Sequence, residues 1–175
     1  ISLAQWTTLG RFFGPKIISE EIPFIMGTEF SWVVVKIWKK VNKWKIGDEV
    51  INITANTPEH GSWANFRCVN QNKVRVKPQE LSHKEAVSMI IPGCVAYGMV
   101  MYSKVKKGDR CLVLGASGGI WGILTQILKA KWAIVTGLCS TRNIEKVNAH
   151  GADFVIDYTK ESFSEILLNF KKNLL

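Results

Sequence analysis

The chain is poor in cysteine, proline and acidic residues, and it lacks a long hydrophobic run. Its 175 residues include four cysteines and five prolines, and 14 Asp and Glu against 23 Lys and Arg leave a formal net charge of +9. The cysteines are too widely spaced for a disulfide scaffold or a paired-cysteine metal site, which favours a reducing compartment. The longest nearly apolar stretch, 30–35, is far short of the roughly 18 residues that a spanning helix needs. We therefore expect no membrane span.

The remaining composition is that of a globular protein with one domain or two small ones. Hydrophobic residues make up 47% and charged residues 21%, which is too apolar for intrinsic disorder. The lysines are scattered, and aromatic residues are not interleaved with them as on a single-strand binding surface. The basic charge therefore indicates a solvated face, and we expect no nucleic-acid partner.

The first part of the chain, to about residue 80, has the pattern of short strands broken by turns. Apolar and β-branched runs follow Gly-Asp or Gly turns, and the last run alternates strictly before it stops at Pro78. Four runs are expected to form or to contain strands: 32–35, 45–51, 62–69 and 73–77. This half is predicted to be all-β.

From Ser82 the hydrophobic period changes. Ser82 and Glu85 have the spacing of a capping box, and helical spacing follows until Pro92, where we expect the helix to end. Strands and helices then alternate: strand 110–114, helix 120–131, strand 133–139, helix 143–150, strand 154–158 and helix 161–172. This order predicts right-handed βαβ units with a parallel sheet.

A glycine-rich turn stands between the first of these strands and its helix. It reads Gly115-Ala116-Ser117-Gly118-Gly119 and opens the helix directly. Such a turn lets backbone N–H groups approach a pyrophosphate, and the helix N-terminus adds a partial positive charge. The context favours nucleotide binding over an ordinary tight turn.

The end of the next strand bears on which dinucleotide would bind. An NAD site usually has Asp or Glu there, but this chain has Cys139-Ser140-Thr141-Arg142-Asn143 and no carboxylate until Glu145. Ser140 can donate a hydrogen bond and Arg142 can pair with a 2′-phosphate. NADP is therefore favoured over NAD, and a polar loop with an unrelated arginine is the alternative.

Several motifs together resemble one protein family. They are 115–119, 107–110, 151–153 and 155–158 in the second half, and 22–27, 30–31, 45–50 and 61–66 in the first. Over about residues 22–163 the chain resembles the zinc-independent quinone oxidoreductase branch of the medium-chain dehydrogenase/reductases. Within that branch it is most similar to the mitochondrial reticulon-interacting oxidoreductases.

The resemblance implies an α/β fold in which both ends of the complete enzyme are missing. An incomplete GroES-like β domain, residues 1–92, would be followed by the first half of a Rossmann dinucleotide-binding domain, residues 93–175. No metal site is expected, because the three histidines lack Cys or carboxylate partners at ligand spacing: His60, His83 and His150.

The resemblance also implies a metal-independent hydride transfer from NADPH to a small molecule, a quinone or an α,β-unsaturated carbonyl. The resemblance assigns Ser117, Gly119 and Ile120 to the pyrophosphate, Ser140 to the 2′-phosphate, and Tyr158 to a place near the adenosine. Gly118 of the turn and Arg142 of the loop complete the predicted cofactor residues. No catalytic residue is identified, and the compartment is mitochondrial or cytoplasmic. A non-catalytic relic or interaction module is the alternative function, and a homodimer is left open.

Three large residues replace small ones of the family at tight positions. Trp121 stands at the third glycine of the dinucleotide fingerprint, where an indole is expected to push the helix outward or to reorganise the turn. Trp132 replaces a glycine before the second strand, and Trp32 replaces a small residue after Ser31. Val95 also replaces a threonine that relatives have near the nicotinamide.

Overall fold

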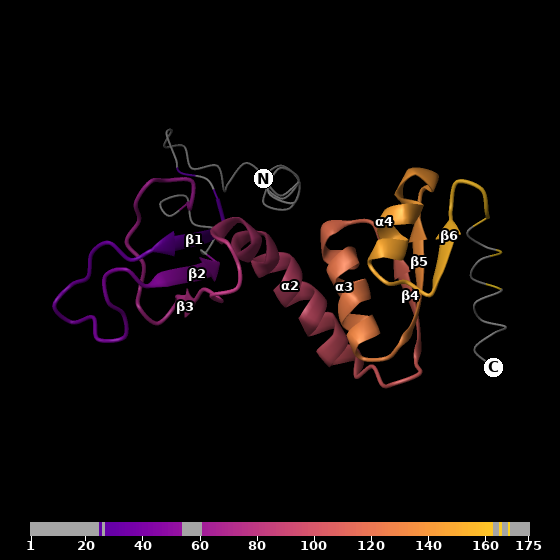
Figure 1. Cartoon of the computed structure of the whole chain (residues 1–175), viewed down its shortest axis with the longest axis horizontal. Coiled ribbons are helices and arrows are strands. Elements are labelled where there is room, and N and C mark those ends of the chain that lie inside the picture. Colours follow the sequence, from indigo (N-terminus) through magenta and orange to yellow (C-terminus); the bar gives the residue numbers. More distant parts are fainter. Residues whose placement is uncertain (1–24, 26, 54–60, 163–164, 166–167, 169–175) are drawn as a thin grey trace, which may run out of the picture. The chain divides into compact units, whose positions relative to one another are not determined.

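In the computed structural model the chain divides into two compact units, residues 1–91 and 92–175, and each is described by itself. The structure describes residues 25, 27–53, 61–162, 165 and 168 (Figure 1). His60, residues 22–24 and 26 of the family resemblance, and most of the helix expected over 161–172 lie outside these residues.

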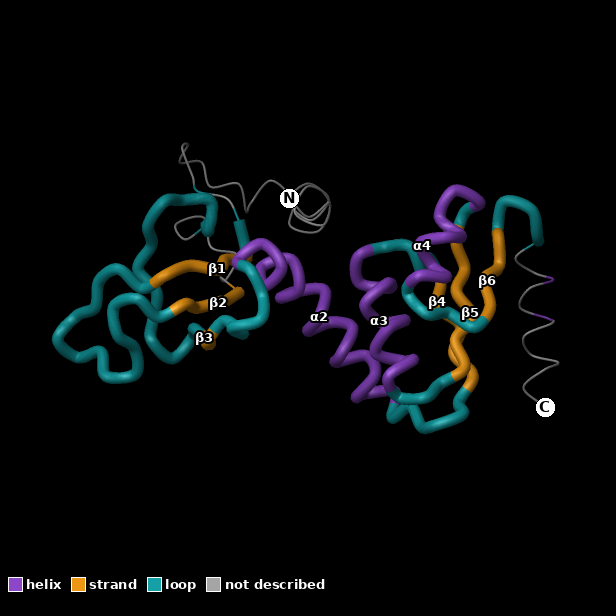
Figure 2. Tube along the Cα trace, viewed as in Figure 1, coloured by secondary structure: helices purple, strands orange, loops and turns teal. Residues whose placement is uncertain are grey.

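The first unit contains a three-stranded antiparallel sheet with the order β1-β2-β3. Its strands are β1 (Glu29–Val33), β2 (Glu49–Ile53) and β3 (Arg75–Val76). Trp32 pairs with Val50, and Val50 pairs with Val76. Phe30, Val50 and Val74 form its buried core, and long loops join the strands (Figure 2). The predicted β character of this unit is therefore confirmed.

One of the four expected strands is wrong, and the others are shifted or shortened. Residues 62–69 form bends and irregular backbone, and Phe66 in this run is 77% exposed. Its partial alternation therefore has no partner strand among the described residues. β2 begins at Glu49, after the Gly-Asp turn, and β3 keeps only two residues of the run 73–77.

The helix α2 (His83–Ser103) begins at the expected capping box. The Ser82 amide donates to Glu85 Oε2 at 2.8 Å, and the Glu85 amide donates to Ser82 Oγ at 3.3 Å. The expected end at Pro92 is wrong, because the helix continues through this residue. Pro92 cannot donate to the carbonyl of Ser88, but Ser88 is exposed and water can solvate that carbonyl.

Within the described part of the chain, α2 is the one helix that is long and apolar enough to cross a membrane. On the sequence alone, residues 30–35 are the longest apolar stretch, because the helix is expected to end at Pro92. The structure corrects that estimate, since α2 continues past this residue. Ala96 and Val100 of this helix are buried in the core of the second unit, which is the position of a core helix. The absence of a membrane span stays a prediction.

The second unit has the expected alternation of strands and helices. Its elements after α2 are β4 (Arg110–Leu114), α3 (Gly119–Ala130), β5 (Ile134–Cys139), the 3₁₀ turn η1 (Thr141–Asn143), α4 (Ile144–Ala149) and β6 (Phe154–Asp157). The sheet is parallel with the order β4-β5-β6. α3 packs on β4 and β5, and α4 packs on β5 and β6. The predicted βαβ units are therefore confirmed.

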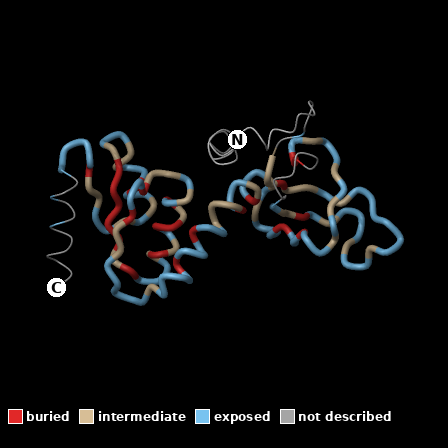
Figure 3. The backbone as a smooth tube through the Cα atoms, turned by 180° about the vertical axis from the view of Figure 1, so that it is seen from behind, coloured by how far each residue is buried: buried red, intermediate tan, exposed pale blue. Residues whose placement is uncertain are grey.

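The middle strand β5 is the most deeply buried element of this unit. Residues 135–139 are all buried, and Figure 3 shows this buried stretch at the centre of the sheet. Leu124 and Leu128 of α3 and Val147 of α4 complete the core on the side of the helices. Consecutive side chains of a strand point to opposite faces, so β5 is buried on both faces of the sheet, which requires apolar residues along its length, as its sequence predicted.

Candidate functional site

The carboxyl ends of β4, β5 and β6 meet at one edge of the parallel sheet. The Ala116 amide after β4 donates to Leu138 O at 2.9 Å, and the Tyr158 amide after β6 donates to Cys139 O at 3.1 Å. The structure thus brings together the three segments that the sequence assigned to a cofactor: the glycine turn, the loop after β5, and Tyr158.

The glycine turn is held by its own backbone and opens the helix α3. Gly115 has a φ of +68°, and the Gly118 amide donates to Gly115 O at 2.9 Å. Ala116 is fully buried, while Gly119 is exposed and a Cβ there would meet nothing within 4 Å. The turn is therefore close-packed on its inner side and accessible at the start of the helix.

The N-terminus of α3 has the properties of an anion-binding end. Gly118 supplies no side-chain cap, and the first turn contains no acidic residue. Within the described part of the chain, the amides of Gly119 and Ile120 donate no hydrogen bond. These free donors and the partial positive charge of the helix end suit a phosphate group.

Trp121 neither displaces this helix nor separates it from the sheet. α3 begins at Gly119 and packs on β4 and β5. The indole lies beside the turn, with its Cδ1 3.1 Å from the position of a Cβ on Gly118, and it is 37% exposed. The close approach belongs instead to Gly122, where a Cβ would lie 2.5 Å from Cε1 of His150. The indole at position 121 is therefore accommodated without the expected outward shift of the helix.

The loop after β5 presents polar side chains at the same edge. Ser140 Oγ accepts a hydrogen bond from Asn143 Nδ2 at 3.0 Å. Arg142 is exposed and makes no hydrogen bond or ion pair with any described residue. Tyr158 is 51% exposed. The guanidinium is therefore available to an anionic ligand, and the assigned role of each residue stays a prediction.

A buried carboxylate, which sequence reasoning did not assign to the site, organises this loop. Asp157, 6% exposed at the end of β6, accepts a hydrogen bond from Thr141 Oγ1 at 2.5 Å. Its other oxygen accepts from the amide and the hydroxyl of Thr159. These bonds, first the one from Thr141, hold the pKa of Asp157 below its usual value. The signals in the sequence were its position at the end of the third strand of this unit and its place in the motif 155–158.

A lysine on α4 also reaches the glycine turn. Lys146 Nζ donates to the carbonyl oxygen of Ser117 at 2.8 Å, across 29 positions of the sequence. Nothing in the local sequence of α4 indicated this contact, because only the packing of α4 beside the turn creates it.

In the first unit, polar side chains connect the sheet to the start of α2. His83 Nδ1 lies 2.7 Å from Ser31 Oγ, and His83 Nε2 lies 3.1 Å from Glu49 Oε1. Lys77, whose side chain is 4% exposed, pairs with Glu49 at 3.0 Å and lowers the pKa of that carboxyl. The sequence indicated no partner for His83, whereas in the structure its ring connects the start of α2 to β1 and β2.

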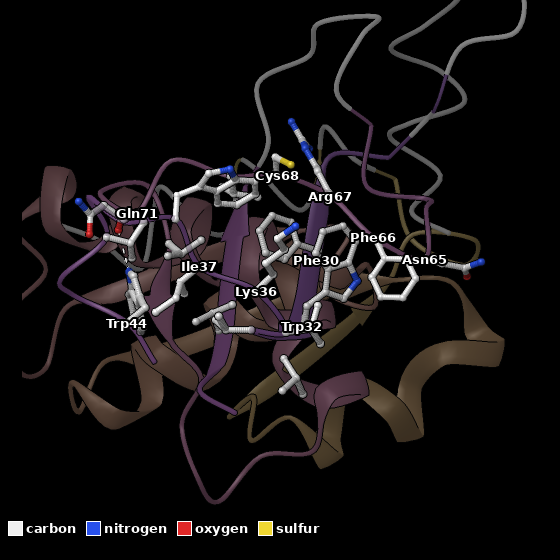
Figure 4. Close-up of a pocket in the computed structure, with 18 residues that line it drawn as sticks. Phe30, Trp32, Lys36, Ile37, Trp44, Asn65, Phe66, Arg67, Cys68 and Gln71 are labelled. Atoms are coloured by element: carbon white, nitrogen blue, oxygen red, sulfur yellow. Dashed lines mark hydrogen bonds between the residues drawn. The ribbon is translucent and has the colours of Figure 1, made fainter. Parts of the chain in front are cut away.

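The first unit also contains an apolar hollow of about 700 Å³ (Figure 4). Phe30 stacks on Trp32 with ring centroids 4.3 Å apart, and both rings line the hollow. Trp44 closes one side and donates from its indole to Gln71 O at 2.9 Å. Lys36 and Arg67 are the charged side chains in its lining, and the free Cys68 is its one thiol. The residues that the sequence assigned to a cofactor lie instead at the edge of the parallel sheet.

No protein-family model matches the chain. Over 163 residues, which are 89% of this chain, it is 37% identical to the mitochondrial NAD(P)H oxidoreductase RTN4IP1 of Mus musculus, of which it covers 40%. It is 32% identical over 165 residues, 90% of this chain, to the 2-methylene-furan-3-one reductase of Solanum lycopersicum, of which it covers 42%. The chain thus spans about two fifths of the length of these relatives.

Solved structures share the fold of the chain over most of its length. The quinone oxidoreductase of Coxiella burnetii is similar with a TM-score of 0.85 and 29% identity, over 95% of this chain and 53% of that protein. A mycobacterial protein solved in complex with NADPH has a TM-score of 0.74 and 25% identity, over 94% of this chain and 49% of that protein. These similarities confirm the expected fold class, an incomplete GroES-like β domain followed by the first half of a Rossmann domain.

Proposed function

We propose that the second unit binds the adenosine half of NADPH. The chain is a partial and divergent relative of the quinone oxidoreductases in the medium-chain dehydrogenase/reductase superfamily, and this relationship supports the proposal. The observation that carries this proposal is the shared edge of the parallel sheet, where the glycine turn, the loop after β5 and Tyr158 meet. In open α/β sheets, ligands bind outside the carboxyl ends of the strands.

The glycine turn is proposed to hold the diphosphate. The free amides of Gly119 and Ile120 point out of an uncapped helix end, and Ser117 and Gly118 lead into it. Backbone donors and the helix dipole act together on the same anion, and no side chain of the first turn competes for them. The accessible backbone at Gly119 supports this role.

The loop after β5 is proposed to recognise the 2′-phosphate of the adenosine ribose. Arg142 has no partner among the described residues, and a guanidinium can bind a phosphate through two hydrogen bonds. Ser140 and Tyr158 lie at the same edge and would contact the adenosine end. Asp157 ends β6 and not β5, where an NAD site has its carboxylate, and its two oxygens accept hydrogen bonds from Thr141 and Thr159. This arrangement supports NADPH over NADH.

The reaction is proposed to reduce a quinone or an α,β-unsaturated carbonyl without a metal. NADPH supplies a hydride when bound, and the names of the relatives, NAD(P)H oxidoreductase and 2-methylene-furan-3-one reductase, support this class of acceptor. The part of this chain that the structure describes would bind and orient the adenosine half. No residue in it is assigned as catalytic, and Tyr97 is a helix residue that is 56% exposed.

The organisation of the chain is part of the proposal. Residues 1–92 would form the GroES-like domain and residues 93–175 the cofactor domain, and the division of the chain between residues 91 and 92 supports this boundary. A mitochondrial location is proposed from the mitochondrial relatives.

Removal of the Arg142 guanidinium tests the cofactor assignment. Arg142→Ala is expected to weaken NADPH binding about tenfold or more, because a charge-assisted phosphate contact is lost, and to leave NADH binding unchanged. Quenching of the fluorescence of the seven tryptophans during titration measures both affinities. Arg110→Ala, at the amino end of β4, is the matched control. An unchanged ratio of the NADPH and NADH affinities would refute the 2′-phosphate assignment.

A second candidate function, a non-catalytic relic or interaction module, is favoured by Trp121. Its indole lies beside Gly118 and Gly115, next to the backbone that a diphosphate would approach. If this indole blocks the turn, the wild-type chain shows no saturable quenching with NADPH, while Trp121→Gly restores it. Saturable quenching of the wild-type chain would instead exclude this alternative for the cofactor site.

A further inference from the structure

Lys146 brings a positively charged side chain to the glycine turn, in addition to the partial positive charge of the N-terminus of α3. It is an exposed residue of α4, and its Nζ donates to the carbonyl oxygen of Ser117, the residue two positions before α3 begins. An ammonium group carries three N–H donors, and this contact uses one of them. Two donors therefore remain for another acceptor at the turn.

The contact with Ser117 also brings the ammonium close to the N-terminus of α3. The N-terminus of a helix carries a partial positive charge, so a lysine beside it repels the helix dipole. No acidic residue in the first turn of α3 and no side-chain cap compensates for this repulsion. The ammonium, the helix end and the free amides of Gly119 and Ile120 thus add positive potential in one place.

We propose that Lys146 is a cofactor-binding residue that acts on the diphosphate of the dinucleotide, an inference that rests on the proposed function of the same edge. Its hydrogen bond to Ser117 holds α4 against the turn and holds the ammonium near the free amides. Arg142 differs from it in its contacts: it lies in η1 after β5, and it makes no hydrogen bond to the glycine turn. The two cations would therefore act on different phosphates of the same ligand.

The test replaces the ammonium by an uncharged group of similar length. Lys146→Met in the full chain is expected to weaken the binding of NADPH and NADH alike, by roughly three- to tenfold, because both cofactors contain the diphosphate. The ratio of the two affinities stays that of the wild type. Lys131→Met, at the opposite end of α3, removes the same charge from an exposed position and serves as the control.

The dependence of binding on salt separates a charge effect from a structural one. Lys146→Met is expected to reduce the loss of NADH affinity between low and high salt, and Lys146→Arg is expected to keep it, because arginine keeps the charge. Thermal unfolding of each variant, followed by circular dichroism, verifies that the second unit remains folded.

Each result bears on a different proposal. If the wild-type chain binds neither cofactor, the proposed function fails and this inference fails with it. If the wild type binds but Lys146→Met behaves like Lys131→Met, only the inference on Lys146 is overturned. It is also overturned if NADPH binding alone weakens, because the residue would then act on the 2′-phosphate, or if the salt dependence stays that of the wild type.

Discussion

At the scale of single residues, Trp132 shows what a bulky side chain costs at a turn position with positive φ. It lies in the tight connection between α3 and β5 with a φ of +62°, a left-handed conformation that favours glycine. Its side chain is 73% exposed, and Lys107 Nζ lies 5.7 Å from the centre of the ring. An exposed indole with one weak cation–π contact contributes little stabilisation, so it offsets little of the free-energy cost of the strained backbone.

We therefore expect Trp132→Gly to stabilise the second unit. Relief of the strained φ outweighs the added freedom of glycine in the unfolded chain, and the net gain is about 1 kcal/mol. Urea unfolding followed by circular dichroism measures it. Trp132→Ala is the control, because it removes the same indole and leaves the strain, and an equal gain in both variants would contradict this explanation.

Trp121 and Gly122 show the effect of moving the close-packing glycine of the dinucleotide fingerprint by one position. The sequence placed a large residue where the family has a close-packing glycine, and it predicted a conflict between helix and strand. In the structure the indole lies beside the turn, and Gly122 supplies the close approach, to His150. His150 is far along the chain, so no reading of the turn alone identifies this neighbour.

At the scale of elements, the capping box at the start of α2 is a local device that the sequence shows directly. Ser82 and Glu85 bond each other's backbone amides. Ser82→Ala is expected to lower the free energy of unfolding by about 1 kcal/mol, because a capping hydroxyl is lost. Ser88→Ala is the control: its hydroxyl bonds a carbonyl inside the helix and caps nothing. An equal effect of both substitutions would contradict the role of the cap.

The end of the same helix could not be predicted from a local sequence motif. Proline usually ends a helix in water, and Pro92 predicted that end. α2 continues because Ala96 and Val100 bury their side chains in the core of the second unit, and this burial offsets one lost backbone hydrogen bond. Residues 62–69 show the opposite difference: a strand was expected, but the segment is irregular and pairs with no strand of the described residues.

At the scale of the whole molecule, acid is expected to destabilise both units. Four carboxyls have a pKa below the ordinary value in the folded chain because each accepts hydrogen bonds, mainly from a lysine or a hydroxyl: Glu49, Glu85, Asp153 and Asp157. A lowered folded pKa contributes stability above the unfolded value, 4.5 for Glu and 3.8 for Asp, and that stability is lost as the pH falls through the folded value.

The urea midpoint of unfolding is therefore expected to be nearly constant between roughly pH 6 and 5 and to fall steadily from about pH 4.5 to pH 3. Asp153→Asn tests one contributor, because Asp153 pairs with Lys129 at 2.7 Å and accepts the amide of Val135. The variant is less stable at about pH 6 and loses less on acidification. A midpoint that rises as the pH falls would contradict the assignment.

The sequence by itself determined the alternation of strands and helices in the second unit, the glycine turn, and the polar loop after β5, because local periodicity and turn chemistry encode them. Only the tertiary structure decided which side chains meet at the sheet edge. The parallel register aligns the three strand ends. Folding then brings Asp157 to Thr141, Lys146 to Ser117 and His150 to Gly122. These contacts join residues that are 16 to 29 positions apart and lie on separate elements, so no local sequence pattern contains them.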